Sequence, residues 1–325
     1  MSRVDPPTGI MSSPHRRQTD VKFLIQAYAE LVRLPNVFTA VADIALGWLC
    51  ATAAGVSLSD WPLFILLALA SACLYSSGMV WNDFFDVAQD QNERPSRPIP
   101  SGRVSRKSAA IFAVVLQVLG VTFAVAAALF AEQARWSSPL VGLALASAII
   151  LYDAWLKHTF AGPIAMGSCR FLNILLGLSI ADSEMIPWSS RIYLAAIVGI
   201  YITGVTWFAR TEAKTSSRTA LKSAAIVMLA ALLLTLAVPK VVVPSTPSIL
   251  FPYLLVGMGL LIAFPIAAAI NVPAPAQVQK AIKRCLLGLV VLDAILASAV
   301  AGTAGLLILL FLLPVMYLGR WIYST

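Results

Sequence analysis

The residues best suited to chemistry in this 325-residue chain lie in the stretch Asn82-Asp83-Phe84-Phe85-Asp86-Val87-Ala88-Gln89-Asp90, which holds three of the 15 acidic residues. On a helix, at about 100° per residue, the four side chains of Asn82, Asp83, Asp86 and Asp90 fall within an arc of roughly 100° and can face one point. Carboxylate and amide oxygens are hard donors that suit Mg²⁺. The spacing therefore predicts a face that can hold a divalent cation.

This acidic stretch closes a long apolar run and opens directly into a basic segment, Arg94-Pro95-Ser96-Arg97-Pro98-Ile99-Pro100-Ser101-Gly102-Arg103. Clustered carboxylates repel one another, and the end of a membrane-length apolar run adds a desolvation cost unless a cation or water relieves it. The alternative interpretation is a solvated acidic helix end followed by a basic loop. The apolar context favours the cation site.

The composition indicates an integral membrane protein. Hydrophobic residues make up 59% of the chain and charged residues 12%, against roughly 45–50% and 25% in soluble domains. The apolar runs are about 20 residues long and rich in Leu and Ala, which predicts helices rather than a barrel. The four cysteines lie in apolar runs without pairing or metal spacing, and the net charge of +8 is distributed as a membrane topology requires rather than as a nucleic-acid surface.

We predict an all-α, polytopic membrane helical bundle with nine transmembrane helices, or ten if Gly302 and Gly305 break the last run. Residues 1–18 are expected to form a disordered basic tail, and 19–325 a single transmembrane domain that starts with an interfacial helix at 19–33. The predicted spans are 34–49, 61–82, 108–131, 139–156, 162–180, 191–209, 219–238, 249–270 and 285–318.

The Lys and Arg residues predict the orientation of these spans. With the N-terminus inside, most of the 23 basic residues fall on the inner side, as the positive-inside rule requires. The acidic stretch and the basic segment after it are therefore expected at the cytoplasmic side of a bacterial inner membrane or its equivalent.

Further polar residues gather on the same predicted side. Tyr152, Asp153 and Lys157 end the fourth span, although Asp153 and Lys157 are also spaced for a simple helix-surface ion pair. Arg170 and Asn173 lie one turn apart in the fifth span, where an arginine needs a partner or a wet cavity.

Two other spans carry polar residues of their own. Asn36 and Asp43 share a face of the first span, and Asn36 is also suited to cap its start. Asp293, in the last run, is expected to be a packing polar residue.

These residues support a resemblance to a known family. Asn82-Asp83-x-x-Asp86-x-x-x-Asp90 with Arg94-Pro95-x-Arg97-Pro98-Ile99-Pro100-Ser101-Gly102-Arg103 closely resembles the first aspartate motif of the UbiA superfamily of membrane prenyltransferases. The resemblance extends to Arg33-x-Pro35-Asn36 and to Tyr152-Asp153 with Lys157. The stretch Gly162-Pro163-x-x-Met166-Gly167-x-Cys169-Arg170-x-x-Asn173 looks most like the EboC branch.

The resemblance implies a bundle with a central cavity and a Mg²⁺-dependent transfer of a prenyl group from a prenyl diphosphate to an aromatic or other small acceptor through an allylic cation. Diphosphate leaves readily only when metal and cationic side chains match its charge. By resemblance, Asn82, Asp86 and Asp90 hold Mg²⁺ with Asp83 in support, and Lys157, Arg170, Arg94, Arg97 and Arg103 neutralise the diphosphate. Further site residues implied in this way are Asn36, Tyr152, Asp153, Asn173, Arg210, Glu212 and Lys214.

The chain departs from the family pattern at the second aspartate motif, which normally has two aspartates four residues apart. Alignment on Arg218-Thr219 places Phe208 and Glu212 there, so one carboxylate is lost, while Arg210 and Lys214 lie nearby. This departure supports an alternative function, a non-catalytic or weakly active protein that binds a prenyl lipid or quinoid compound. A transporter is disfavoured because the charged groups cluster at one face rather than near the membrane midplane.

Overall fold

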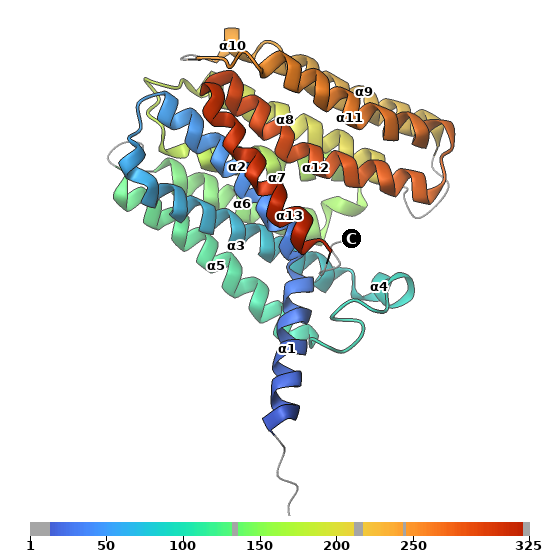
Figure 1. The fold of residues 1–325 in the computed structure, drawn as a ribbon. Helices are drawn as coiled ribbons and strands as arrows, with labels where there is room; N and C mark the ends of the chain where they lie inside the picture. Colours follow the sequence, from blue (N-terminus) through green and yellow to red (C-terminus); the bar gives the residue numbers. More distant parts are fainter. Residues whose placement is uncertain (1–13, 132–135, 211–216, 243–244, 321–325) are drawn as a thin grey trace, which may run out of the picture.

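In a computed structural model, which describes residues 14–131, 136–210, 217–242 and 245–320, the protein is an all-helical bundle (Figure 1). Eight helices in these ranges are long and apolar enough to cross a membrane, which confirms eight of the nine predicted spans. They are α2 (Leu34–Ala53), α3 (Trp61–Phe85), α5 (Arg106–Phe130), α6 (Ser137–Ala154), α7 (Gly162–Gly177), α8 (Trp188–Ala209), α9 (Arg218–Thr235) and α11 (Phe251–Asn271).

The ninth predicted span is broken, as its glycines predict. It forms α12 (Pro275–Val300), a 3₁₀ helix at Gly302–Phe311 and α13 (Leu312–Leu318). Gly302 takes a φ of +65°, a conformation that glycine adopts without a steric penalty. A side chain at Gly305 would lie 2.2 Å from the backbone nitrogen of Ser298, so the short apolar helix packs back against α12.

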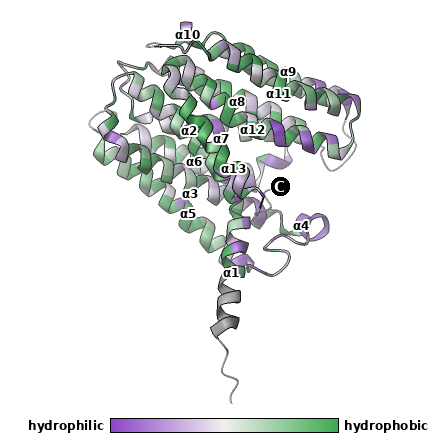
Figure 2. Ribbon diagram, viewed as in Figure 1, coloured by the Kyte–Doolittle hydropathy of each residue, from purple (hydrophilic) through white to green (hydrophobic). Residues whose placement is uncertain are grey.

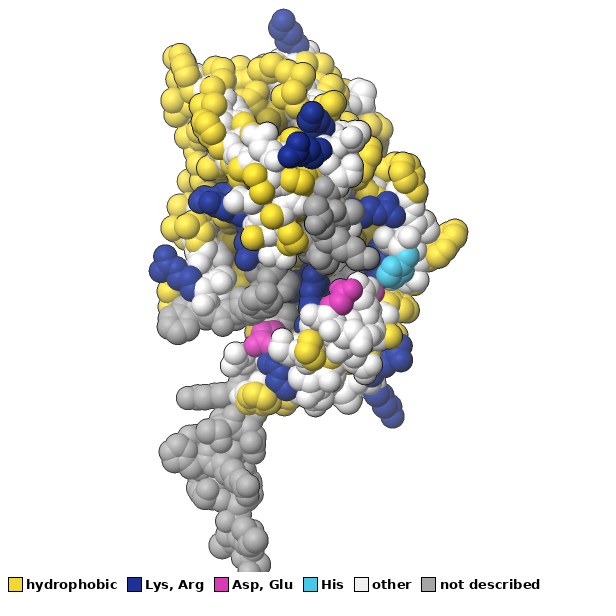
Figure 3. Space-filling model, turned by 90° about the vertical axis from the view of Figure 1, so that its right-hand side faces the viewer, with side chains coloured by type: hydrophobic (Ala, Val, Ile, Leu, Met, Phe, Trp, Pro, Cys, Tyr) yellow, Lys and Arg dark blue, Asp and Glu magenta, His cyan; other side chains and the backbone are white. Residues whose placement is uncertain are grey.

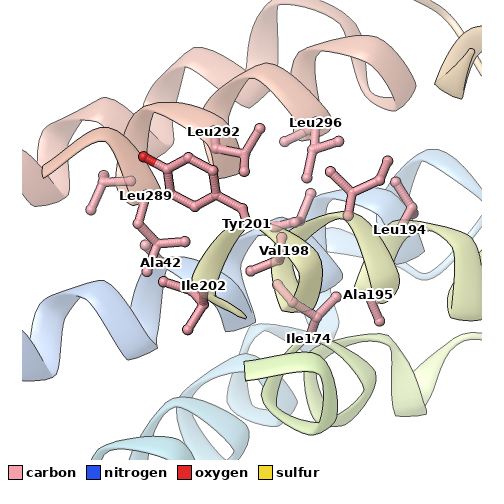
Figure 4. Packing of buried hydrophobic residues seen from close by; sticks show 14 of the residues in the cluster. Ala42, Ile174, Leu194, Ala195, Val198, Tyr201, Ile202, Leu289, Leu292 and Leu296 are labelled. Carbon is pink, nitrogen blue, oxygen red and sulfur yellow. The ribbon is translucent and has the colours of Figure 1, made fainter. Parts of the chain in front are cut away.

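Small residues and interlocking apolar side chains hold the bundle together. Gly47 on α2 and Gly177 on α7 are in backbone contact, since a Cβ at Gly47 would lie 2.3 Å from the carbonyl carbon of Gly177; such close approach is typical of packed membrane helices. Around Tyr201 on α8, apolar side chains of α2, α7, α8 and α12 interdigitate (Figure 4). The Tyr201 hydroxyl donates to the Cys285 carbonyl at 2.8 Å, so this buried polar atom is satisfied.

Hydrophilic residues are concentrated at one end of the bundle, around α4 (Val87–Glu93) and the segment that follows it (Figure 2). The N-terminal helix α1 (Pro14–Leu31) projects from that end (Figure 1). It begins five residues before the predicted start at Thr19, and its location in a membrane interface stays a prediction. A short helix, α10 (Val238–Val241), lies between α9 and α11.

Candidate active site at the mouth of the bundle

The acidic stretch does not form the single continuous helix that its spacing predicts. Helix α3 ends at Phe85, α4 begins at Val87, and Asp86 lies between them with φ −88° and ψ 7°. Across the bend, Asp83 and Asp90 still contact the same Arg97 nitrogen, whereas Asp86 pairs with Lys157. The prediction of one continuous helix is therefore wrong, although Asn82, Asp83 and Asp90 remain close to one another through Arg33 and Arg97.

The basic segment after α4 is folded over the end of α3. Gly102 takes a φ of +75°, which permits the turn, and the Arg103 guanidinium donates to the Ser96 carbonyl at 2.7 Å across the base of the loop. Ile99 and Val104 are buried in a small apolar cluster with Val80 of α3. Apolar anchors thus hold the loop's arginines over the acidic residues.

Arg97 links two of the three carboxylates. Its Nη1 atom lies 3.1 Å from Asp83 Oδ1 and 2.7 Å from Asp90 Oδ2. The Asp83 and Asp90 side chains are both 4% exposed and that of Arg97 is 12% exposed. Poor access to water strengthens the attraction within such a group and makes the loss of one partner costly.

Arg33 is a site residue that the sequence interpretation did not assign. It joins α1 to α2 in the left-handed region, with φ 50° and ψ 53°, a conformation that costs a non-glycine residue of order 1–3 kcal/mol and is found at functional sites. In this position its Nη2 donates to Asn82 Oδ1 and to Asp83 Oδ1, each at 3.4 Å. The pattern Arg33-x-Pro35-Asn36 was the signal that could have identified it.

Lys157 reaches the third carboxylate. Helix α6 ends at Ala154 and a 3₁₀ turn follows at Leu156–His158, so the helical spacing of Asp153 and Lys157 is lost. Lys157 Nζ instead lies 2.7 Å from Asp86 Oδ1. The alternative of an Asp153–Lys157 helix-surface pair is thus replaced by a contact between elements.

Asp153 and its neighbours complete this side of the site. Asn82 Nδ2 donates to Asp153 Oδ1 at 3.3 Å, and the half-buried Tyr152 precedes Asp153 at the end of α6. His158 Nε2 lies 3.8 Å from Asp86 Oδ1, and sequence reasoning did not assign a role to it.

A polar cavity of about 450 Å³ adjoins these ion pairs. It is lined by the basic segment, by α1 and by the end of α3, and includes Arg33, Asp83, Arg94, Arg97 and Arg103. Arg103 also pairs with Glu30 of α1 at 2.6 Å. Acidic and basic side chains lie close together on the face shown in Figure 3, and Asp83 and Asp90 are buried rather than spread into solvent.

Two predicted site residues, Arg170 and Asn173, make contacts inside the bundle. Arg170 Nη1 lies 2.9 Å from Asp43 Oδ2 and its Nη2 donates to Thr39 Oγ1 at 2.9 Å. Asn173 Nδ2 donates to the same Asp43 oxygen at 2.7 Å. The structure therefore gives Arg170 a counter-ion, and a contact of Arg170 or Asn173 with a diphosphate stays a prediction.

The structure describes only part of the predicted second motif. Phe208 is 1% exposed and belongs to the apolar core, which is where a buried phenyl ring is stable and a carboxylate is not. Arg210 donates to the Thr159 carbonyl at 2.7 Å and so contacts the loop after Lys157. The predictions for Glu212 and Lys214 lie outside the described residues.

The donors present are of the kind that fits a hard divalent cation. Among the described residues no group of three or more His, Cys, Asp or Glu side chains is arranged to hold a metal ion. The oxygens of Asn82, Asp86 and Asp90 instead each meet a cationic side chain, Arg33, Lys157 and Arg97 respectively. Each oxygen is thus already matched to positive charge, and Asp and Asn oxygens are ligands that Mg²⁺ accepts.

Fold and site together define a multi-pass integral membrane protein whose helical bundle carries an ion-paired polar mouth at one end. The sequence profile of the UbiA prenyltransferase family matches residues 44–287, and the chain belongs to that family.

Curated relatives include the digeranylgeranylglyceryl phosphate synthases of Saccharolobus solfataricus, 28% identical over 184 residues, and of Methanosarcina mazei, 32% identical over 186 residues. These matches cover 55% and 54% of this chain and span 60% and 62% of the relatives' length. Both are digeranylgeranylglyceryl phosphate synthases rather than EboC-like proteins.

Solved structures show the same fold. A structure described as giving insight into digeranylgeranylglyceryl phosphate synthase in membranes has a TM-score of 0.61 at 20% identity and covers 86% of this chain and 99% of its own. A UbiA homologue from Archaeoglobus fulgidus bound to GPP and Mg²⁺ has a TM-score of 0.57 at 18% identity, covering 83% of this chain and 99% of its own. The UbiA-like helical fold predicted from the sequence is confirmed.

Proposed function

We propose that this protein transfers a prenyl group from a prenyl diphosphate to a small acceptor at the polar mouth of the bundle. The observation that carries the proposal is the enclosed set of carboxylates and cations at that mouth, with Lys157 on Asp86 and Arg97 on Asp83 and Asp90. Family membership and the Mg²⁺-bound homologue support it.

The proposed chemistry requires that the diphosphate leave with the electron pair of the broken C–O bond. An acceptor nucleophile then captures the allylic cation and loses a proton. Arg97 and Lys157 stabilise the developing charge on the leaving group because they are held in place before the reaction begins. Arg33, Arg94 and Arg103 line the adjoining cavity and supply further positive charge.

Mg²⁺ is the proposed cofactor, and Asn82, Asp86 and Asp90 are the residues that would hold it. When bound, a divalent cation neutralises the oxygens of the diphosphate as a Lewis acid. The carboxylates of Asp90 and Asp86 pair with Arg97 and Lys157 in this structure, so these cationic side chains lie beside the residues that would hold the metal. Asp83 keeps its pairing with Arg33 and supports the arrangement.

The proposed acceptor belongs to one of two chemical classes. An aromatic acceptor agrees with the superfamily resemblance, whereas a glycerol-phosphate prenyl ether agrees with the names of the two relatives. The finer assignment to the EboC-like branch, which draws on the stretch from Gly162 to Asn173, also stays a prediction. The mouth is proposed to face the cytoplasm because the basic residues concentrate at that end; reporter fusions in the loop at 94–103 test this orientation.

A second candidate function is supported by Phe208. The buried phenyl ring at this position removes a carboxylate of the second aspartate motif, so the chain could bind a prenyl diphosphate or a quinoid lipid without turning it over. This candidate predicts binding of the diphosphate with no release of pyrophosphate.

The deciding experiment measures pyrophosphate release by the purified protein in lipid nanodiscs with geranyl, farnesyl and geranylgeranyl diphosphates, Mg²⁺ and both acceptor classes. We expect release with at least one pair, and its loss in Asp86→Asn and in Asp90→Asn. Asp60→Asn, at the far end of α3, is the matched control and should retain activity. Binding of the diphosphate without turnover would favour the second candidate, and full activity in both site variants would remove the metal assignment.

A further inference from the structure

Asp293 is not the isolated packing residue that its sequence context predicts. It lies on α12 with its side chain fully buried, and it interacts with Asp43 of α2, which is also fully buried. The two carboxyl groups are close enough to interact with each other. The structure thus brings together two acidic residues 250 positions apart in an apolar interior.

The positive charge beside this pair is too small for two carboxylates. Arg170 is the cationic partner and contacts Asp43 Oδ2 at 2.9 Å, while Asn173 donates to the same oxygen. Neither Asp293 oxygen, nor Asp43 Oδ1, meets an N–H or O–H donor from the described part of the chain. The other titratable side chains that interact with the pair are Tyr75 of α3 and Tyr201 of α8, and the Tyr201 hydrogen is already donated to the Cys285 carbonyl.

Two arguments indicate that the pair of Asp43 and Asp293 needs a positive charge in addition to that of Arg170. Both Asp293 oxygens and Asp43 Oδ1 are buried without a donor from the described part of the chain, and a buried polar atom without a partner is costly unless a proton on one carboxyl group joins the pair. In a medium of low dielectric constant, two adjacent carboxylates with one guanidinium leave an uncompensated negative charge, and such a charge is strongly destabilising inside a bundle. One added proton makes the group of Asp43, Asp293 and Arg170 neutral.

We propose that Asp43 and Asp293 form a proton-binding site inside the bundle, in which the two carboxyl groups share one proton and Asp43 keeps the negative charge that pairs with Arg170. Asp293 is then a positioning residue. It donates to Asp43, and through Asp43 it orients Arg170 and Asn173. This holds α12 against α2 and α7 without a net charge in the membrane interior.

Polar side chains of α2 and α3 also lie beside Arg170. The Arg170 guanidinium lies over the ring of Tyr75, 5.3 Å from its centroid, and Tyr75 interacts with Asn36 at the start of α2. The existence of the proton site does not depend on prenyl transfer.

Infrared spectroscopy of the protein in lipid nanodiscs tests the proposal, because a protonated carboxyl group has a C=O stretching band that a carboxylate lacks and that shifts in D₂O. We expect Asp293→Asn to fold and to lose absorbance equivalent to one carboxylic acid per chain. Asp60→Asn, which alters an exposed aspartate, should leave the band unchanged.

The partner substitutions separate a shared proton from an independent one. Asp43→Asn should also lose the band, because Asp293 then ionises to balance Arg170. The double variant Asp43→Asn/Asp293→Asn should have a lower melting temperature than either single variant, since Arg170 is left without a counter-ion.

Three results would overturn the proposal. An unchanged band in folded Asp293→Asn would show that Asp293 carries no proton. Failure of Asp293→Asn to fold would do the same, because asparagine has the shape and charge of the protonated acid. The third result is a melting temperature that rises with Na⁺ but not with choline at equal ionic strength in the unaltered protein. If Asp293→Asn lost this dependence, the site would bind a metal cation instead of a proton.

Discussion

Removal of the Arg97 guanidinium is the most direct test of how the mouth is held together. Arg97 forms an ion pair with Asp90, and Asp83 pairs with both Arg97 and Arg33. Arg97→Gln keeps a polar side chain of similar length but removes the charge. The two carboxylates, each 4% exposed, are then left close together, and Asp83 keeps its pairing with Arg33.

The size of the effect follows from burial. Breaking a buried ion pair by removing one partner costs about 3–5 kcal/mol. The lower end applies here because Arg97 is 12% exposed and Asp83 retains Arg33 at 3.4 Å, which gives about 3 kcal/mol. At roughly 2 °C per kcal/mol for a chain of this size, the melting temperature should fall by about 6 °C.

The assay is thermal unfolding in nanodiscs without divalent cations, followed by the same measurement with Mg²⁺. Lys107→Gln is the matched control, because Lys107 is exposed, and exposed substitutions change stability by about 0.5 kcal/mol or less. Mg²⁺ should raise the melting temperature of Arg97→Gln more than that of the unaltered protein, since the freed carboxylates bind it more tightly. If Arg97→Gln folds and has the same melting temperature as Lys107→Gln, both with and without Mg²⁺, the reasoning is refuted.

Three further predictions concern other contacts. Lys157→Gln should lower kcat for prenyl transfer by about 10²–10³-fold, as loss of one preorganised donor does. Lys157→Arg should restore part of the lost rate. A kcat of Lys157→Gln equal to that of the unaltered protein would show that Lys157 does not act on the leaving group. Gly47→Ala should destabilise the protein by roughly 1–3 kcal/mol, the cost of overpacking, because the new Cβ would lie 2.3 Å from the Gly177 backbone. Gly257→Ala, with open space around it, is the control in the same melting assay. Arg191→Met should lower the melting temperature because the buried guanidinium donates to two backbone carbonyls at 2.7 and 2.8 Å, each worth roughly 1–3 kcal/mol when left unsatisfied; an unchanged melting temperature would contradict this.

The membrane class, the helices and the family motif follow from the sequence alone. Apolar runs of about 20 residues can satisfy their backbone in a bilayer only as helices, so eight of the predicted spans match the structure to within a few residues. The break at Gly302 follows from a residue type whose backbone tolerates positive φ. The motif from Asn82 to Arg103 was recognisable because its residue types and spacing are local properties of the chain.

Only the tertiary structure decided which charges pair. Local spacing placed the acidic residues on one helix and left an Asp153–Lys157 helix pair open as an alternative, whereas the end of α6 brings Lys157 to Asp86 instead. Arg170 and Asp43 are 127 positions apart, and no pattern in either span pointed to Asp293 as their neighbour. The energy of a charge depends on the distance and dielectric environment of groups that the fold brings together, and the linear sequence contains neither quantity.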